Sequence, residues 1–147
     1  MTDLESRIWQ IIGRPQTAAL ATIGEDGAPW VRYVTIRAER DFALNFCTAR
    51  STRKARQIAS RPDVHLTCGN LNPPDGSAYV QVAGRAEVRS DAATRRRHWQ
   101  EEWRRYFSGP DDPEYVIVLV RPAFIEYNAP GALEPEVWRN PTFDVSR

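Results

Sequence analysis

Lysine is almost missing from this chain of 147 residues: Lys54 is the only one among the twenty lysine and arginine residues. Cysteine and histidine are nearly as scarce, with two of each. Cys47 and Cys68 lack the spacing of zinc ligands, and each falls in an alternating apolar stretch, so we expect no metal site and a reducing, cytoplasmic location. His65 and His98 have no evident partner, which predicts structural or surface roles for both.

A large excess of charge is absent as well. Twenty basic residues against nineteen acidic ones leave a net charge of +1, which does not provide the broad basic surface of a general nucleic-acid binder. No apolar run approaches the roughly eighteen residues of a membrane span, and no basic-then-apolar leader follows Met1. We therefore expect no nucleic acid, no membrane insertion and no secretion.

Familiar catalytic motifs are missing too. The chain contains no GxSxG, HExxH, CxxC or P-loop sequence. Its carboxylates are scattered mainly in turns, so nothing indicates hydrolytic chemistry, and no residue can be named as catalytic.

What the sequence does contain is a series of short alternating strands. The apolar residues of 1–14 recur at helical spacing between a cap at Asp3 and a stop at Gly13, which predicts a leading helix. Strands are predicted at 17–22, 30–37, 42–48, 64–68, 79–88 and 115–120, the last continuing to 127, and Gly84 predicts a bulge. Two further helices are predicted at 51–60 and 91–107. An exposed loop is predicted at 71–77 and an irregular tail at 128–147.

These elements predict the fold class. Six short strands with turn signals, interrupted by two helices, are typical of a closed or nearly closed antiparallel barrel rather than a parallel sheet. We therefore expect a mainly β protein with flanking helices, and one domain over residues 1–147, a length that buries about two thirds of its unfolded surface.

Lys54 stands in the run Thr48–Arg56, where a strand is followed by a helix. With Ser51 as the N-cap, the amides of Thr52, Arg53 and Lys54 would point out of the helix, beside the positive end of its dipole. Cations in a first helical turn are unfavourable unless an anion offsets them. The run therefore predicts a phosphate site, although a solvent-exposed helix start would have the same residues.

A second candidate lies on the strand 30–37. Arg32 shares a strand face with apolar residues, which is unusual for a guanidinium unless it lies at the barrel rim, over an aromatic ring, or against an anion. Arg37 falls on the opposite face of a regular strand, so one pocket would use both only through a bulge or a subunit boundary.

Several segments occur in a characteristic order, namely residues 17–22, 27–34, 46–48 with 51–58, 80–87, 109–115 and 122–127. In this order they resemble the FMN-binding split-barrel family that includes pyridoxamine 5'-phosphate oxidase, and particularly its general stress protein branch. The resemblance implies a six-stranded antiparallel split β-barrel, and FMN near the interface of a homodimer. By the same resemblance, the cofactor-binding residues are Arg32, Tyr33, Val34, Thr35, Cys47, Thr48, Thr52, Arg53, Lys54, Tyr79 and Trp138.

The chain also departs from the oxidases. Residues 128–133 read NAPGAL where the oxidases have an arginine-leucine-histidine segment, Arg37 replaces their substrate-side lysine, and Tyr79 stands where they have a flavin-contacting glutamine. True pyridoxamine phosphate oxidase activity is therefore not expected. The resemblance implies instead a flavin-dependent oxidoreductase with an unidentified small-molecule substrate.

Two alternatives remain open. Related split barrels bind the deazaflavin F420, haem or another tetrapyrrole, so the ligand of this barrel could be one of these. The other alternative is a non-catalytic dimeric barrel that holds flavin or a protein partner.

Overall fold

Seven strands form one antiparallel sheet in the computed structural model, which describes residues 1–69 and 76–146. The strands are β1 (Gln16–Ile23), β2 (Pro29–Ala38), β3 (Leu44–Ala49), β4 (Asp63–Gly69), β5 (Tyr79–Arg89), β6 (Tyr115–Asn128) and β7 (Glu136–Arg139). The helices are α1 (Asp3–Ile12), α2 (Arg53–Ser60), α3 (Ala92–His98) and the short 3-10 helix η1 (Glu101–Arg105).

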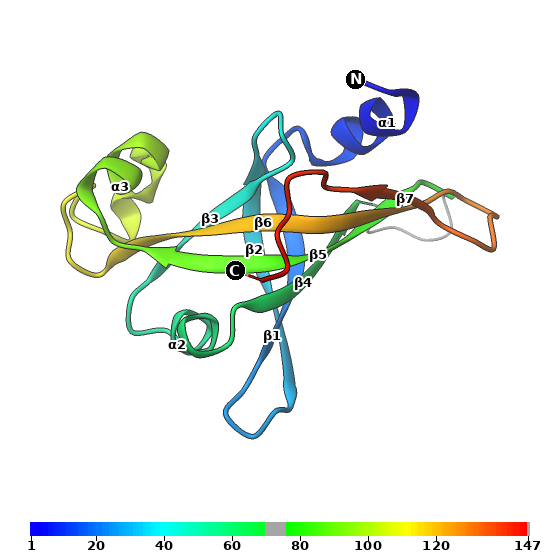
Figure 1. Ribbon diagram of the computed structural model, residues 1–147. Helices are drawn as coiled ribbons and strands as arrows, with labels where there is room; N and C mark the ends of the chain where they lie inside the picture. Colours follow the sequence, from blue (N-terminus) through cyan, green and yellow to red (C-terminus); the bar gives the residue numbers. More distant parts are fainter. Residues whose placement is uncertain (70–75, 147) are drawn as a thin grey trace.

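The first six strands close into a barrel. Their order is β3-β2-β1-β4-β5-β6, and β3 also pairs with the first half of β6, which closes the ring (Figure 1). β7 adds to β6 outside this ring, and the tip of the β1–β2 hairpin extends beyond it. The predicted six-stranded antiparallel split barrel is confirmed.

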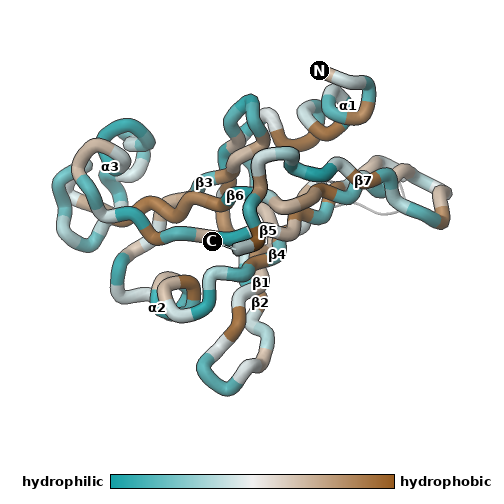
Figure 2. Tube along the Cα trace, in the orientation of Figure 1, coloured by the Kyte–Doolittle hydropathy of each residue, from teal (hydrophilic) through white to brown (hydrophobic). Residues whose placement is uncertain are grey.

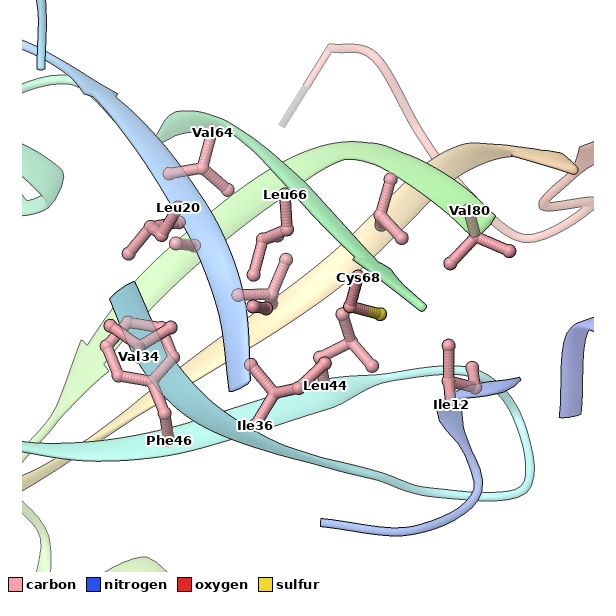
Figure 3. Packing of buried hydrophobic residues seen from close by; sticks show 14 of the residues in the cluster. Ile12, Leu20, Val34, Ile36, Leu44, Phe46, Val64, Leu66, Cys68 and Val80 are labelled. Carbon is pink, nitrogen blue, oxygen red and sulfur yellow. The ribbon is translucent and has the colours of Figure 1, made fainter. Parts of the chain in front are cut away.

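The barrel interior is apolar because alternate residues of each strand point inward. Leu20, Ile36, Leu44 and Leu66 are almost completely buried there and converge in Figure 3. Ile12 of α1 adds to the same cluster, which places the leading helix against the barrel. Figure 2 shows the contrast in polarity between the apolar central strands and the hydrophilic helix α3.

The predicted bulge at Gly84 is confirmed. The register between β5 and β6 shifts between Ala83 and Gly84. A Cβ atom at Gly84 would overlap the carbonyl oxygen of Arg121, so the two strands approach each other closely only because this residue has no side chain.

Two helix predictions were partly wrong. The cap of α1 is Thr2 rather than Asp3, because Thr2 and Glu5 form a reciprocal capping box. The predicted helix at 91–107 is divided: α3, capped by Asp91, ends at Trp99, whose extended backbone separates it from η1. Helical spacing alone does not detect this break, which follows from the packing of the Trp99 ring against Tyr115, with ring centroids 5.1 Å apart.

Two strand predictions also need correction. Phe42 lies in the turn before β3, with a φ of 72°, and its buried ring packs edge-on against Trp138 at 4.9 Å. Such a backbone conformation is costly for a residue with a side chain, and the buried aromatic contact offsets that cost. The tail predicted as irregular contributes β7, because pairing with β6 supplies order that no local pattern encodes.

Most of the predicted loop at 71–77 lies outside the described residues, which do not include 70–75. Among the residues that are described, no helix is long and apolar enough to cross a membrane.

Candidate functional site

A cavity of about 610 Å³ lies between β2, β3, the start of α2 and the segment around η1. We call it the β3 cavity. Its lining comprises Tyr33, Val34, Thr35 and Arg37 from β2; Asn45, Phe46, Cys47, Thr48 and Ala49 from β3; Lys54 from α2; and Glu102, Trp103, Arg105, Tyr106 and Phe107 from η1 and the turn after it.

Strand alternation places β3 between this cavity and the core. Leu44 and Phe46 belong to the buried cluster of the barrel, whereas Cys47 and Ala49 pack with the aromatic residues of the α3–η1 segment. The far wall is aromatic: Trp103 and Phe107 both pack against the buried Tyr115, with ring centroids 5.8 and 5.4 Å apart. This wall is therefore packed against the barrel and does not project into solvent.

The Cys47 thiol faces the cavity and is half-buried. Burial raises its pKa to about 11, although the nearby cations Lys54 and Arg37 act in the opposite direction. At neutral pH the cavity therefore presents a neutral thiol rather than a reactive thiolate.

Charged groups border the cavity at its β2 side. Arg37 donates a hydrogen bond to Glu102 of η1 at 3.0 Å and forms an ion pair with it, which links the strand to the opposite wall. Arg105 lies on the same wall as Glu102. The opposite face of β2 holds Arg32, so the prediction that Arg32 and Arg37 lie on different faces agrees with the structure.

Asn45 carries an unusual polar group. Its side chain is 3% exposed, and its Oδ1 has no hydrogen-bond partner in the part of the chain that the structure describes. A buried acceptor without a donor costs about 1–3 kcal/mol. Sequence reasoning missed Asn45, although its position two residues before Cys47 puts both on one strand face.

The start of α2 differs from the prediction. Thr52, not Ser51, is the N-cap residue, and the Ser51 hydroxyl instead donates to Glu114 at 2.9 Å. Thr52 also uses its own amide, which donates to the carbonyl of Ala49, so this amide is not free. The first hydrogen bond of the helix runs from the Arg56 amide to the carbonyl oxygen of Thr52, at 3.2 Å. The amides of the three residues between them belong to the first turn of α2.

Thr52 is linked to the cavity through its hydroxyl. Its Oγ1 lies 3.1 Å from Oγ1 of Thr48, which lines the cavity, and donates to the Ala49 carbonyl at 2.8 Å. The two threonines therefore join the end of β3 to the first turn of α2.

Three cations gather at this helix start without acidic partners. None of the ion pairs among the described residues involves Arg32, Arg53 or Lys54. Burial lowers the pKa of Lys54, and the charge of Arg32 lowers it further. The pKa of Arg32 is also lowered by burial and by Arg53. These groups repel one another, and an anion between them would relieve that repulsion.

Arg53 points away from the β3 cavity. Its guanidinium lies over the ring of Trp30, 4.3 Å from the centroid, and lines a second hollow between α2 and the β1–β2 hairpin. Here the aromatic contact that we considered for Arg32 belongs to Arg53 instead.

The structure brings most of the predicted site residues together. Those lining the β3 cavity are Tyr33, Val34, Thr35, Cys47, Thr48 and Lys54, with Thr52 and Arg32 directly beside them. Tyr79 and Trp138 do not line it within one chain: Tyr79 pairs with Gly69 and Asn128, and Trp138 packs on Phe42. Within residues 1–69 and 76–146, no group of histidine, cysteine, aspartate or glutamate could hold a metal ion.

A comparison with known families decides the classification. Residues 4–129 match the model described as pyridoxamine 5'-phosphate oxidase. The chain belongs to the pyridoxamine 5'-phosphate oxidase family. General stress protein 26 of Bacillus subtilis is 30% identical over 90% of this chain and 94% of that protein, which supports the general stress protein branch.

Solved structures agree with this family. The crystal structure of general stress protein 26 from Bacillus anthracis has a TM-score of 0.79 at 28% identity, and the match covers 94% of this chain and 99% of that one. A protein described as an F420 reductase matches with a TM-score of 0.61 at 25% identity, over 80% of this chain and 94% of that one. A haem-binding protein from Mycobacterium smegmatis, 22% identical with a TM-score of 0.70 over 92% of this chain and 57% of that one, shows the shared fold.

Proposed function

We propose that this protein binds FMN in the β3 cavity and is a flavin-dependent oxidoreductase rather than a pyridoxamine phosphate oxidase. The observation that carries the proposal is the half-buried Lys54 on the cavity lining, with the half-buried Arg32 close to it; neither cation has an acidic partner among the described residues. A phosphate dianion supplies the charge that this end of the cavity lacks.

The remaining lining fits the rest of the cofactor. From Lys54 the cavity continues along β3 past Thr48 and Cys47 toward an aromatic wall that contains Trp103. Mostly apolar pockets with a few polar groups are typical of sites for planar organic cofactors. Bound FMN would supply the redox chemistry, while this chain anchors the phosphate, orients the ring and excludes water.

The exposed apolar surface beside the cavity supports a homodimer. Val31, Tyr33 and Tyr106 are 70%, 75% and 68% exposed, and two of them line the cavity mouth. Large exposed apolar side chains that cluster in this way mark interaction surfaces. A second copy placed here would cover the cavity, and the family resemblance assigns it that position.

Light scattering of the purified protein tests the dimer. We expect a dimeric mass for the wild type and a monomeric mass for Tyr33→Glu, because a carboxylate on this apolar surface is costly to bury. A wild-type monomer at micromolar concentration would exclude the dimer.

The free thiols of Cys47 and Cys68 are compatible with the reducing cytoplasm that we propose as the location of this protein.

An absorbance spectrum of freshly purified protein tests the cofactor. We expect the visible flavin band, or its appearance with a fluorescence change when FMN is added. Absence of both would overturn the proposal, and the distinct bands of F420 or haem would identify those alternatives. The chemistry of the cavity favours FMN over haem, because neither His65 nor His98 lines it and its cysteine is a neutral thiol.

Stopped-flow mixing with NADH or NADPH then tests redox activity. We expect bleaching of the flavin band by at least one of the two nucleotides. Bound FMN that neither nucleotide reduces, together with no turnover of an electron acceptor, would indicate the non-catalytic flavin-binding dimer instead.

A further inference from the structure

A small hydrogen-bond network lies under the start of α2 and joins three elements. Arg32 of β2 donates from Nη1 to Thr22 Oγ1 of β1 at 2.6 Å and from Nη2 to Gln57 Oε1 of α2 at 3.0 Å. The Thr22 hydroxyl in turn donates to the same Gln57 oxygen at 2.6 Å. Arg32 also donates to the carbonyl of Trp30 at 3.2 Å.

Every acceptor in this network is neutral. Thr22 is 1% exposed and contributes a hydroxyl, and Gln57 contributes an amide oxygen that accepts from two donors at once. The guanidinium is thus held in one orientation while its positive charge remains uncompensated. A glutamate in place of Gln57 would accept the same two hydrogen bonds and would also neutralise Arg32.

The network also determines where Lys54 lies. Gln57 and Lys54 are three residues apart on α2, so they share one side of the helix. Gln57, fixed against β1 and β2, therefore acts with the buried Ala55 and Ile58 to set the rotation of the helix and the position of the lysine beside the cavity. Thr22, Arg32 and Gln57 together connect the barrel to the predicted phosphate site.

We propose that Gln57 and Thr22 are positioning residues that hold Arg32 as an oriented, uncompensated cation, and thereby make the site selective for the phosphorylated form of its ligand. The inference rests on the proposed FMN function and goes further: it assigns the discrimination between FMN and riboflavin to two residues that bind neither ring nor phosphate. Because the neutral acceptors leave the charge of Arg32 intact, the phosphate dianion is favoured over a neutral hydroxyl.

Fluorescence titrations of the full chain with FMN and with riboflavin test this inference. We expect Gln57→Glu to raise the Kd for FMN at least tenfold, and to change the Kd for riboflavin by less than twofold. Thr22→Val, which keeps the shape but removes the hydroxyl, should raise the Kd for FMN by a smaller factor, about threefold. Gln10→Glu introduces the same charge at an exposed position of α1 and should leave both affinities unchanged.

The possible results separate this inference from the proposed function. If the wild type binds FMN and Gln57→Glu binds it within twofold as tightly, the inference is wrong and the FMN proposal stands. Equal losses for FMN and riboflavin indicate a purely structural role and also overturn it. A wild type that binds neither flavin overturns the proposed function itself. If Gln57→Glu does not fold, the ratio of the two affinities in Thr22→Val decides.

Discussion

The two sides of β3 differ in whether their side chains find all their interaction partners within one chain. Toward the barrel interior, Leu44 and Phe46 are 1% exposed and pack in the apolar core, and Phe46 also borders the cavity. On the cavity side, Asn45 has an unpartnered oxygen and Cys47 faces the cations Lys54 and Arg37. The inner side is complete within one chain, whereas the outer side has polar and charged groups that a ligand would satisfy.

This difference shows how one short strand serves both stability and binding. The period of two in a strand separates the side chains of neighbouring residues onto opposite faces, so a change on one face leaves the other largely intact. Substitutions on the inner side should therefore affect folding, and substitutions on the outer side should affect binding. Four predictions test this contrast between the barrel core and the cavity side, beginning with the largest effect.

Phe46→Ala should lower the free energy of unfolding by about 3–5 kcal/mol, because it leaves a cavity inside a closed barrel. Urea denaturation followed by circular dichroism measures the loss. Cys47→Ala, one residue along and on the other side, is the matched control, with an expected loss of about 1 kcal/mol. Similar losses in both variants would contradict the separation of the two sides.

Lys54→Ala combined with Arg53→Ala should weaken FMN binding by about 3 kcal/mol, because the charge-assisted bond from Lys54 to the phosphate is lost and the nearby charge of Arg53, which stacks on Trp30, is removed as well. Isothermal titration calorimetry measures the affinity. The free energy of unfolding should stay the same or rise, because the variant removes two cations that each repel Arg32. Arg50→Ala, exposed at the preceding turn, is the control. Unchanged affinity in the double variant would remove this part of the site.

Alkaline pH should destabilise the barrel core through Cys68, a buried residue of β4. Burial raises the pKa of this thiol from 9.0 to about 11 in the folded protein. Between these values the unfolded chain loses the proton and the folded chain keeps it, so stability is lost as pH rises through this window. The loss amounts to about 2 kcal/mol.

Comparing the wild type with Cys68→Ala isolates this contribution. Urea unfolding at about pH 8 and about pH 11 should show a smaller pH-dependent loss in the variant, since the other titrating groups are common to both proteins. The comparison uses the change in the free energy of unfolding with pH, so the constant loss of stability from the cavity that alanine leaves cancels. Equal slopes in the two proteins would contradict the role of Cys68.

Asn45→Leu has the smallest expected effect and the most unusual sign. It should raise the stability of the ligand-free protein by about 1 kcal/mol, because it removes a buried acceptor that has no donor. Ligand affinity should fall if the cofactor or substrate supplies that donor. Leu44→Asn, the reverse change at the neighbouring inner position, should destabilise the protein. Destabilisation by Asn45→Leu would show that its oxygen is satisfied in solution.

Much of the barrel could be predicted from local sequence patterns. The alternation through Leu20 and the apolar spacing before Gly13 act over a few residues, so the strands and α1 were predicted close to their observed bounds. The bulge at Gly84 followed from a glycine inside a strand. Each of these features depends on neighbours in the sequence, which is why a pattern detects it.

Features that depend on distant partners could not be predicted in the same way. Ser51 had the chemistry of a cap, but its hydroxyl is used by Glu114, which is remote in the sequence. β7 forms because β6 offers an edge, and α3 ends at Trp99 because the ring packs on Tyr115. In each case, a long-range contact overrides the local preference.

The same distinction applies to the candidate site. The sequence by itself determined that Lys54 lies in the first turn of a helix after a strand, and that Arg32 and Arg37 lie on opposite faces of β2, because helix starts and strand periods are local properties. Only the tertiary structure decided that Arg53 stacks on Trp30, away from Lys54, and that Gln57 and Thr22 hold Arg32. Those contacts depend on strand register and helix rotation, which are set by packing across the whole barrel.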